Sequence, residues 1–277
     1  MLCFPVRFVF FLCVFNFLLL DNVSSFQSST RLVRPFGESN EAMKMHLLSS
    51  RQAIDDVLHS TGVNGINLDE NTVPTTMKEA FYKFFFTGDR GPLCVVISIL
   101  SFTVARSQIP SFGVADALVF GGTILFWSFQ EHFLHEKVLH SKVDWVGKEI
   151  HQTHHQRPYY HISVDPAPLL LGWMFTAHLV FRSLLPYHLA LTATIAYSLS
   201  GMFYEWAHYI VHTKVRFRSK FWKRVKENHL RHHVVCDEFW FAFSMPIMDD
   251  LFGTNPSVRQ VKRQMDEKKR QEVTSAS

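Results

Sequence analysis

Histidine is the residue type that stands out in this sequence, with 16 histidines among 277 residues. Ten of them fall into four short groups, and the members are His135, His140, His151, His154, His155, His208, His212, His229, His232 and His233. Neutral imidazole is a good ligand for iron, zinc, copper and nickel, so the ligand type alone does not identify the metal. Ten clustered imidazoles are enough for two metal ions with about five ligands each. The sequence therefore predicts a dimetal centre.

Helical spacing brings the members of each group together. Positions i, i+3 and i+4 share one helix face, so we expect groups 151–155 and 229–233 each to present three imidazoles to a single point. Group 208–212 presents two. His135 and His140 are five residues apart, which separates them by about 140° on an ideal helix. That pair requires a kinked or unwound helix, or two different metals.

Four apolar stretches flank these groups, at residues 93–109, 112–133, 167–185 and 188–209. Pro110-Ser111 alone separates the first pair, and Pro186-Tyr187 alone separates the second. A helix of about 20 residues spans the hydrocarbon layer of a bilayer, roughly 30 Å. We therefore expect an all-α membrane protein with two transmembrane helical hairpins, whose tips carry Arg106 and Arg182 as snorkelling residues.

Two hairpins that enter and leave on one side place residues 130–166 and 211–277 in the same compartment. These two segments carry eighteen Lys and Arg residues, against two near the hairpin tips. The positive-inside rule assigns the basic side to the cytosol, or to the stroma of a plastid. All four histidine groups lie on that side, so they are expected to form a helical cap that holds the dimetal site.

The N-terminal third has the composition of targeting segments. Residues 1–25 resemble a signal peptide, and residues 26–75 resemble a transit-peptide-like or disordered leader, rich in Ser and Arg at its start. This order is similar to the bipartite presequences of algae with secondary plastids, so we favour a plastid membrane over the endoplasmic reticulum. Residues 76–91 are expected to hold an interfacial helix, which begins at the capping box Thr76-Met77-Lys78-Glu79. Residues 92–254 then form the core domain, and residues 255–277 a polar tail.

The overall composition excludes some other classes. A net charge of +4 gives no indication of nucleic-acid binding, and we expect none. The four cysteines are scattered, so they predict neither a disulfide framework nor a CxxC metal clip.

The histidine pattern HX4H, HX2HH, HX3H, HX2HH resembles that of the fatty acid hydroxylase/sterol desaturase superfamily. The flanking segments Glu131-His-Phe-Leu-His135, Tyr204-Glu-Trp-Ala-His208-Tyr and Asp249-Asp-Leu-Phe-Gly-Thr254 also resemble family motifs. The resemblance covers about residues 92–254. It departs from the fatty acid 2-hydroxylase branch at Gln152 and at Ser163-Val-Asp-Pro-Ala-Pro, and residues 21–90 do not resemble a fused cytochrome b5 domain.

The resemblance implies a di-iron oxygenase that uses O2 and external electrons and takes a lipid substrate from the membrane. All ten grouped histidines are then iron ligands, with zinc able to substitute. Hydroxylation of an acyl chain is favoured, with desaturation, or sterol or carotenoid oxidation, as alternatives. The electron donor is expected to be ferredoxin in a plastid, or cytochrome b5 with its reductase in the endoplasmic reticulum. It is expected to dock on the basic stretch 214–231.

Two other classes compete with this interpretation, a zinc-dependent membrane hydrolase and a metal-storage protein. A catalytic zinc typically takes three protein ligands and one water, so ten histidines exceed the need of even a two-zinc hydrolase.

Other residues are expected to support the centre. An acyl tunnel is expected to be lined by Trp127, Phe133, Trp173 and Phe203. Acidic residues that orient ligand imidazoles are sought among Glu131, Glu136, Asp165, Glu205, Asp237 and Asp249. Four further histidines are assigned to polar packing or to the interface, namely His132, His161, His178 and His188.

Overall fold

The computed structural model describes residues 73–88, 90–110, 112–143, 145–156, 163–242 and 244–276. Within these ranges the chain is helical and has no strand, which confirms the all-α prediction. The expected signal peptide and nearly all of the transit-like leader lie outside the described residues.

Helix α3 (Met77–Phe86) lies within residues 76–91, where a helix was expected, and begins at the predicted cap. The Thr76 side chain accepts a hydrogen bond from the Glu79 backbone N–H, and the Glu79 carboxylate accepts one from Thr75. Phe84 packs edge-on against Trp206, with ring centroids 5.1 Å apart. The helix is thereby fastened to the end of α8 where the histidines lie, while Phe81, Tyr82 and Phe86 on its outer side are exposed.

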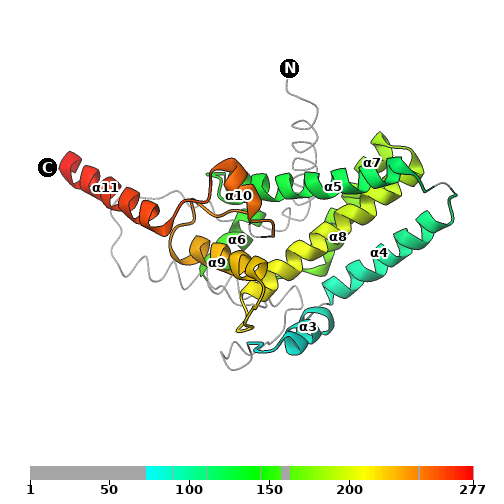
Figure 1. The fold of residues 1–277 in the computed structure, drawn as a ribbon, viewed down its shortest axis with the longest axis horizontal. Coiled ribbons are helices and arrows are strands. Elements are labelled where there is room, and N and C mark those ends of the chain that lie inside the picture. The colour runs from blue at the N-terminus through cyan, green and yellow to red at the C-terminus, as the bar shows by residue number, and fades with distance from the viewer. Residues whose placement is uncertain are drawn as a thin grey trace, which may run out of the picture.

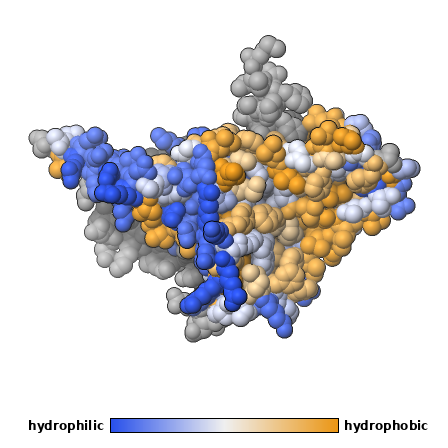
Figure 2. Space-filling model, viewed as in Figure 1, coloured by the Kyte–Doolittle hydropathy of each residue, from blue (hydrophilic) through white to orange (hydrophobic). Residues whose placement is uncertain are grey.

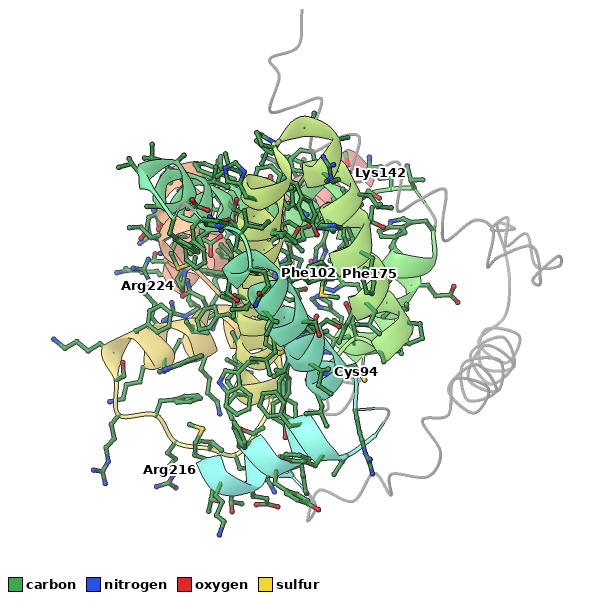
Figure 3. The ribbon with its side chains drawn as sticks, turned by 90° about the vertical axis from the view of Figure 1, so that its right-hand side faces the viewer. Cys94, Phe102, Lys142, Phe175, Arg216 and Arg224 are labelled. Atoms are coloured by element: carbon green, nitrogen blue, oxygen red, sulfur yellow. The ribbon has the colours of Figure 1, made fainter. Side chains whose placement is uncertain are left out.

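Four long helices form the body of the molecule: α4 (Gly91–Ser107), α5 (Val114–Phe133), α7 (Ala167–Leu184) and α8 (Tyr187–Val211). Helix α8 is central, and α4, α5 and α7 all pack on it (Figure 1). Small residues of α7 and α8, Ala177, Ala190 and Ala193, are fully buried where the two helices meet. In Figure 3, which looks along the body from one end, Phe102 of α4 lies beside Phe175 of α7, with ring centroids 6.2 Å apart. Helix α4 therefore packs mainly on α8 and α7, and the first predicted hairpin is splayed rather than closed.

The tip of the first pair corrects the expectation for Arg106. We expected this side chain to reach outward to the interface, but it is 1% exposed. Its guanidinium donates to Asp116 Oδ1 at 2.8 Å and to Thr192 Oγ1 at 3.2 Å. Because a buried charge requires a partner, the carboxylate and hydroxyl hold Arg106 inside. The ion pair ties the α4–α5 connection to the start of α8.

By length and apolar composition, α7 is the one described helix that qualifies alone as a membrane span. The bent pair α3 and α4 would qualify as a second if counted together. Helix α4 has 17 residues, and α5 and α8 carry buried polar residues such as Asp116 and Glu205. The expectation of four spans is not confirmed by this criterion and stays a prediction.

Shorter helices cover one end of the body. The chain leaves α5 through η2 (Leu134–Leu139), continues in α6 (Val146–Gln156), and returns after α8 in α9 (Lys220–Val234) and α10 (Ile247–Phe252). Residues 258–276 form helix α11 (Val258–Ala276), which extends away from the body (Figure 1). We expected a polar tail there and did not predict a helix. All four histidine groups belong to the covered end.

Candidate metal centre

The His135–His140 pair meets because the helix changes its winding. Residues Leu134–Leu139 form a π-helix, in which the backbone N–H of His140 bonds the carbonyl of His135 at 3.3 Å. An i→i+5 bond widens the turn, so residues five apart lie one above the other. Of the two solutions expected for this pair, the structure shows a change in the helix, and both imidazoles point to one group.

The ten predicted histidines gather into two groups of five. In each group the nearest nitrogens all lie within 4.8 Å of one another. We call them the first group (His135, His140, His151, His155 and His232) and the second group (His154, His208, His212, His229 and His233).

The two HX2HH motifs are divided between these groups, which corrects the expectation of a single point for each. On α6, His151 and His155 face the first group and His154 faces the second. On α9, His229 and His233 face the second group and His232 faces the first. Around the helix axis, residue i+4 is rotated by about 40° from residue i, whereas residue i+3 is rotated in the opposite direction. Each of the two helices therefore supplies ligands to both groups and holds the groups side by side.

The spacing of the nitrogens fits metal ions. In the second group, His208 Nε2 lies 2.8 Å from His154 Nε2, and His212 Nε2 lies 2.7 Å from His229 Nε2. In the first group the corresponding contacts between Nε2 atoms run from 2.9 to 3.2 Å. Two ligands at a right angle, each about 2.1 Å from an ion, are roughly 3 Å apart, whereas tetrahedral ligands are roughly 3.4 Å apart. The spacing thus fits centres with more than four ligands.

The electrostatics of the histidines also favour metal binding. Burial, with the neighbouring imidazoles adding to it, holds the pKa values of His135, His151, His229 and His212 well below their ordinary value. Burial also lowers the pKa of His155 to about 4. At neutral pH these rings are therefore uncharged and able to bind a metal through a lone pair.

Backbone carbonyls orient two rings of the first group. The Nδ1 of His135 lies 2.6 Å from the Phe241 carbonyl oxygen, and the Nδ1 of His232 lies 2.7 Å from that of Phe239. A carbonyl only accepts hydrogen bonds, so both Nδ1 atoms carry the proton and both Nε2 atoms present lone pairs to the group. Several such lone pairs about 3 Å apart repel one another unless a cation lies between them.

Two buried carboxylates hold the segment that supplies these carbonyls. We call residues 239–242 with Ser244 the carbonyl segment. Asp249 accepts hydrogen bonds from the backbone N–H groups of Phe241 and Ala242, at 2.9 and 3.2 Å. Glu131 accepts from the backbone N–H of Ser244 at 2.9 Å and from its hydroxyl. Both acids were expected to touch imidazoles directly, but they act through the segment's backbone.

The carbonyl segment also contains a strained residue. Trp240, fully buried, adopts φ of 61° in the left-handed region, and its N–H bonds the Thr254 carbonyl at 2.9 Å. A non-glycine residue there costs about 1–3 kcal/mol and persists only where its surroundings impose it. It separates the two residues whose carbonyls meet His232 and His135. No sequence pattern indicated this role.

The remaining predicted acids lie in different places. Asp237 approaches His140 Nδ1 at 3.9 Å, and Glu136 approaches His132 at 3.7 Å. Asp165 and Glu205 pair with each other, and the Glu205 carboxylate accepts the Asp165 backbone N–H at 3.0 Å. Burial raises the pKa of Asp165 above its ordinary value.

A cavity of about 230 Å³ leads from the histidines into the body. Its lining includes His135 and His151 of the first group and His154 and His208 of the second. Most of the rest is apolar and comes from α4, α5, η2, α6, α7 and α8. Of the four predicted tunnel residues, Trp127 and Trp173 line it, but Phe133 and Phe203 do not. A second recess, of about 310 Å³, touches His155, His232 and His233 together with Cys236 and Asp237.

The other predicted histidines that the structure describes stay outside the groups. His132 is buried, and its Nε2 lies 2.9 Å from Thr254 Oγ1, which itself bonds Asp249. His178 bonds Thr194 Oγ1 at 2.9 Å. His188 lies near the start of α8, and His161 lies outside the described residues.

The profile of the fatty acid hydroxylase family matches residues 120–254. A dihydroceramide fatty acyl 2-hydroxylase of Arabidopsis thaliana is 27% identical over 179 residues, which cover 60% of this chain and 71% of that protein. A fatty acid 2-hydroxylase of Macaca fascicularis is 22% identical over 186 residues, 63% of this chain but 47% of that protein.

A solved structure supports the fold. The hydroxylase domain of Scs7p superposes with a TM-score of 0.52, at 16% identity, over 70% of this chain and 72% of that one. The match is therefore one of architecture.

Proposed function

We propose that the chain, whose residues 120–254 match the profile of the fatty acid hydroxylase family, is a di-iron oxygenase that hydroxylates the acyl chain of a membrane lipid. The observation that carries the proposal is the pair of five-imidazole groups at the mouth of an apolar cavity. The two similar relatives named above act at the 2-position of fatty acyl chains, one of them in dihydroceramide. An acyl chain joined to a sphingoid base is therefore the substrate that we propose first.

The ten histidines would hold the two ions through Nε2. Bound iron would supply the activation of O2 that an unactivated C–H bond requires. The chain's own residues do the rest: the carbonyl segment orients rings of the first group, and the apolar walls exclude water from the reacting carbon. The right-angle spacing of the nitrogens favours iron over a tetrahedral zinc site.

The surface supports a place in the membrane. In Figure 2 apolar side chains gather over the four long helices, and hydrophilic ones gather over the end that carries α9 and α11. Exposed apolar residues on this belt include Ile97, Leu100, Leu118, Leu125 and Leu179. A contiguous apolar surface of this kind marks contact with lipid or protein. We propose that the four helices lie in the bilayer and that the histidine end faces the cytosol or stroma.

The electron donor is proposed to dock on the exposed basic residues near α9. Arg216 and Arg224 lie at the outer edge of the molecule (Figure 3). Lys226, by contrast, donates a hydrogen bond to the Thr213 carbonyl at 2.7 Å and stabilises the fold. The exposed Arg218, Lys220 and Lys223 are therefore the residues to reverse to Glu. Reduction by an acidic donor should slow and lose its salt dependence, while metal content stays unchanged. Unaltered reduction kinetics would refute this docking site.

The activity is tested by lipid profiling. The chain is expressed in a host that lacks 2-hydroxylated acyl lipids, beside His140→Ala as the inactive control. We expect 2-hydroxyacyl sphingolipids to appear with the wild-type chain, only in the presence of O2. New double bonds, oxidised sterols or carotenoids, or hydrolysis products in place of hydroxylated chains would refute the assignment.

A further inference from the structure

Two polar side chains of the cavity lie away from the histidines. Gln130 on α5 and Ser198 on α8 both line the cavity, and they are 2% and 5% exposed. Ser198 precedes His208 by ten residues, which is about 15 Å along the helix axis. Gln130 precedes His135 by five residues, roughly 7.5 Å along α5. These side chains are therefore placed too deep to touch either histidine group.

Both residues carry a polar atom without a hydrogen-bond partner in the described part of the chain. The amide Nε2 of Gln130 donates to the Tyr197 hydroxyl at 2.8 Å, which leaves its Oε1 unpaired. Ser198 Oγ is unpaired as well. Hydroxyls elsewhere on the same helix are satisfied, since Ser200 bonds the Ala196 carbonyl at 2.9 Å and Thr194 bonds that of Ala190 at 2.8 Å. An unpaired buried polar group is unfavourable unless a ligand completes it.

The charge of the cavity lining restricts what that ligand is. Glu131, Asp165 and Glu205 line the cavity, and no Lys or Arg does so among the described residues. A carboxylate or phosphate would therefore find no counter-charge. A neutral hydroxyl fits, because it donates one hydrogen bond to Gln130 Oε1 and accepts another from Ser198.

We propose that Gln130 and Ser198 form a subsite for a hydroxyl group carried by the lipid chain, remote from the carbon that reacts at the histidines. The proposal rests on the proposed function in one respect, that a lipid chain occupies the cavity. A site that hydrogen-bonds a substrate hydroxyl discriminates strongly against a chain without it, because its own polar groups are then left unpaired. The subsite thus selects a chain that already carries oxygen.

The test is equilibrium binding to the iron-loaded protein in lipid nanodiscs without O2, so that no turnover occurs. The probes are dihydroceramides whose acyl chain is either plain or carries one hydroxyl at successive carbons. We expect one position to bind at least about tenfold more tightly than the plain chain. Gln130→Leu and Ser198→Ala should each remove most of that preference, and the matched variant Ser200→Ala should keep it.

Equal binding of all the chains, the result expected if only water meets Gln130 and Ser198, would overturn the subsite. So would a preference that survives in both variants. Each variant is checked for two bound ions, and Ser198→Ala tests the subsite without disturbing the bond from Gln130 to Tyr197. The binding test does not depend on turnover. A lipid that binds with preference here but is never hydroxylated in the lipid-profiling experiment would contradict the proposed function and leave the subsite intact.

Discussion

The two histidine groups have the same donors, five imidazoles each, but differ in how the protein orients them. In the first group, backbone carbonyls fix the protonated nitrogen of His135 and of His232. In the second group, His208 has a hydrogen bond with the backbone of Ser163. The Nδ1 atoms of His154 and His233 are buried and have no partner among the described residues. The first group is therefore the more preorganised of the two.

The difference shows that equal ligand sets need not give equal sites. A hydrogen bond to the distal nitrogen fixes the tautomer and raises the basicity of the ligand. Rings that lack one depend more on the ion itself for their orientation. We expect the first group to hold its ion more firmly, and the second to be the more labile position.

The largest effect should follow from removal of one ligand in either group. His140→Ala in the first group and His208→Ala in the second should each reduce product formation by more than about 100-fold. Changes to residues that only hydrogen-bond a metal ligand already cost about 10–100-fold. His188→Ala, near the far end of α8, is the control and should stay active. Substantial turnover in His140→Ala would show that the first group is wrongly assigned.

The next largest effect should distinguish the two groups, because the carbonyl segment orients rings of the first group. Asp249→Ala removes the acceptor of two backbone N–H groups, so the carbonyls that orient His135 and His232 should lose their position. Affinity for the first ion should fall about 10–100-fold, with little change at the second. Asp250→Ala alters an exposed neighbour that bonds Arg224 and Asn255, and it should retain both ions. Metal titration of the two variants measures this, and equal loss at both groups would contradict the segment's specific role.

A smaller effect should appear on chelation. When the loaded protein meets a chelator, the second group's ion should leave roughly tenfold sooner than the first group's. Stopped-flow absorbance with a chromogenic chelator would resolve two phases. In His208→Ala, which lacks the second ion, only the slow phase should remain, and a surviving fast phase would reverse the order of the groups.

The smallest effect concerns the lowered histidine pKa values that the two groups share. Burial lowers the pKa values of His155 in the first group and His212 in the second, so the folded metal-free chain resists protonation. The histidines of the unfolded chain bind protons as the pH falls below about 6.5. The free energy of unfolding is therefore full above this pH and decreases below it. The Tm of the metal-free protein should drop by about 5 °C between pH 7.5 and 5.5. A Tm that rose on acidification would mean that the histidines are charged in the folded state.

The gathering of the ten histidines could be predicted from sequence, because all four groups border apolar stretches on the same side. Their division into two sets could not, since i+3 and i+4 spacings both satisfy a helix face and only packing decides between them. The π-helix at Leu134–Leu139 was one of the solutions open for a five-residue spacing. The carbonyl segment gave no sequence signal, because its contribution comes from backbone oxygens that every residue has.

Burial was the other property that sequence reasoning missed. Arg106 lies at the end of an apolar stretch, where an exposed position is the usual one. Its inward turn depends on Asp116 and Thr192, which are 10 and 86 residues away along the chain. In the same way, the spacing of the tunnel aromatics did not separate Trp127 and Trp173, which line the cavity, from Phe133 and Phe203, which do not.

The central claim, two separate five-imidazole metal sites, is tested most directly by counting iron. Elemental analysis of the active protein and of two single-ligand variants suffices, with the double variant as reference. We predict two ions per chain in the wild type, one in His140→Ala, one in His208→Ala and none in the variant that combines them. One ion in the active wild-type protein, or loss of both ions from either single variant, would contradict two separate sites.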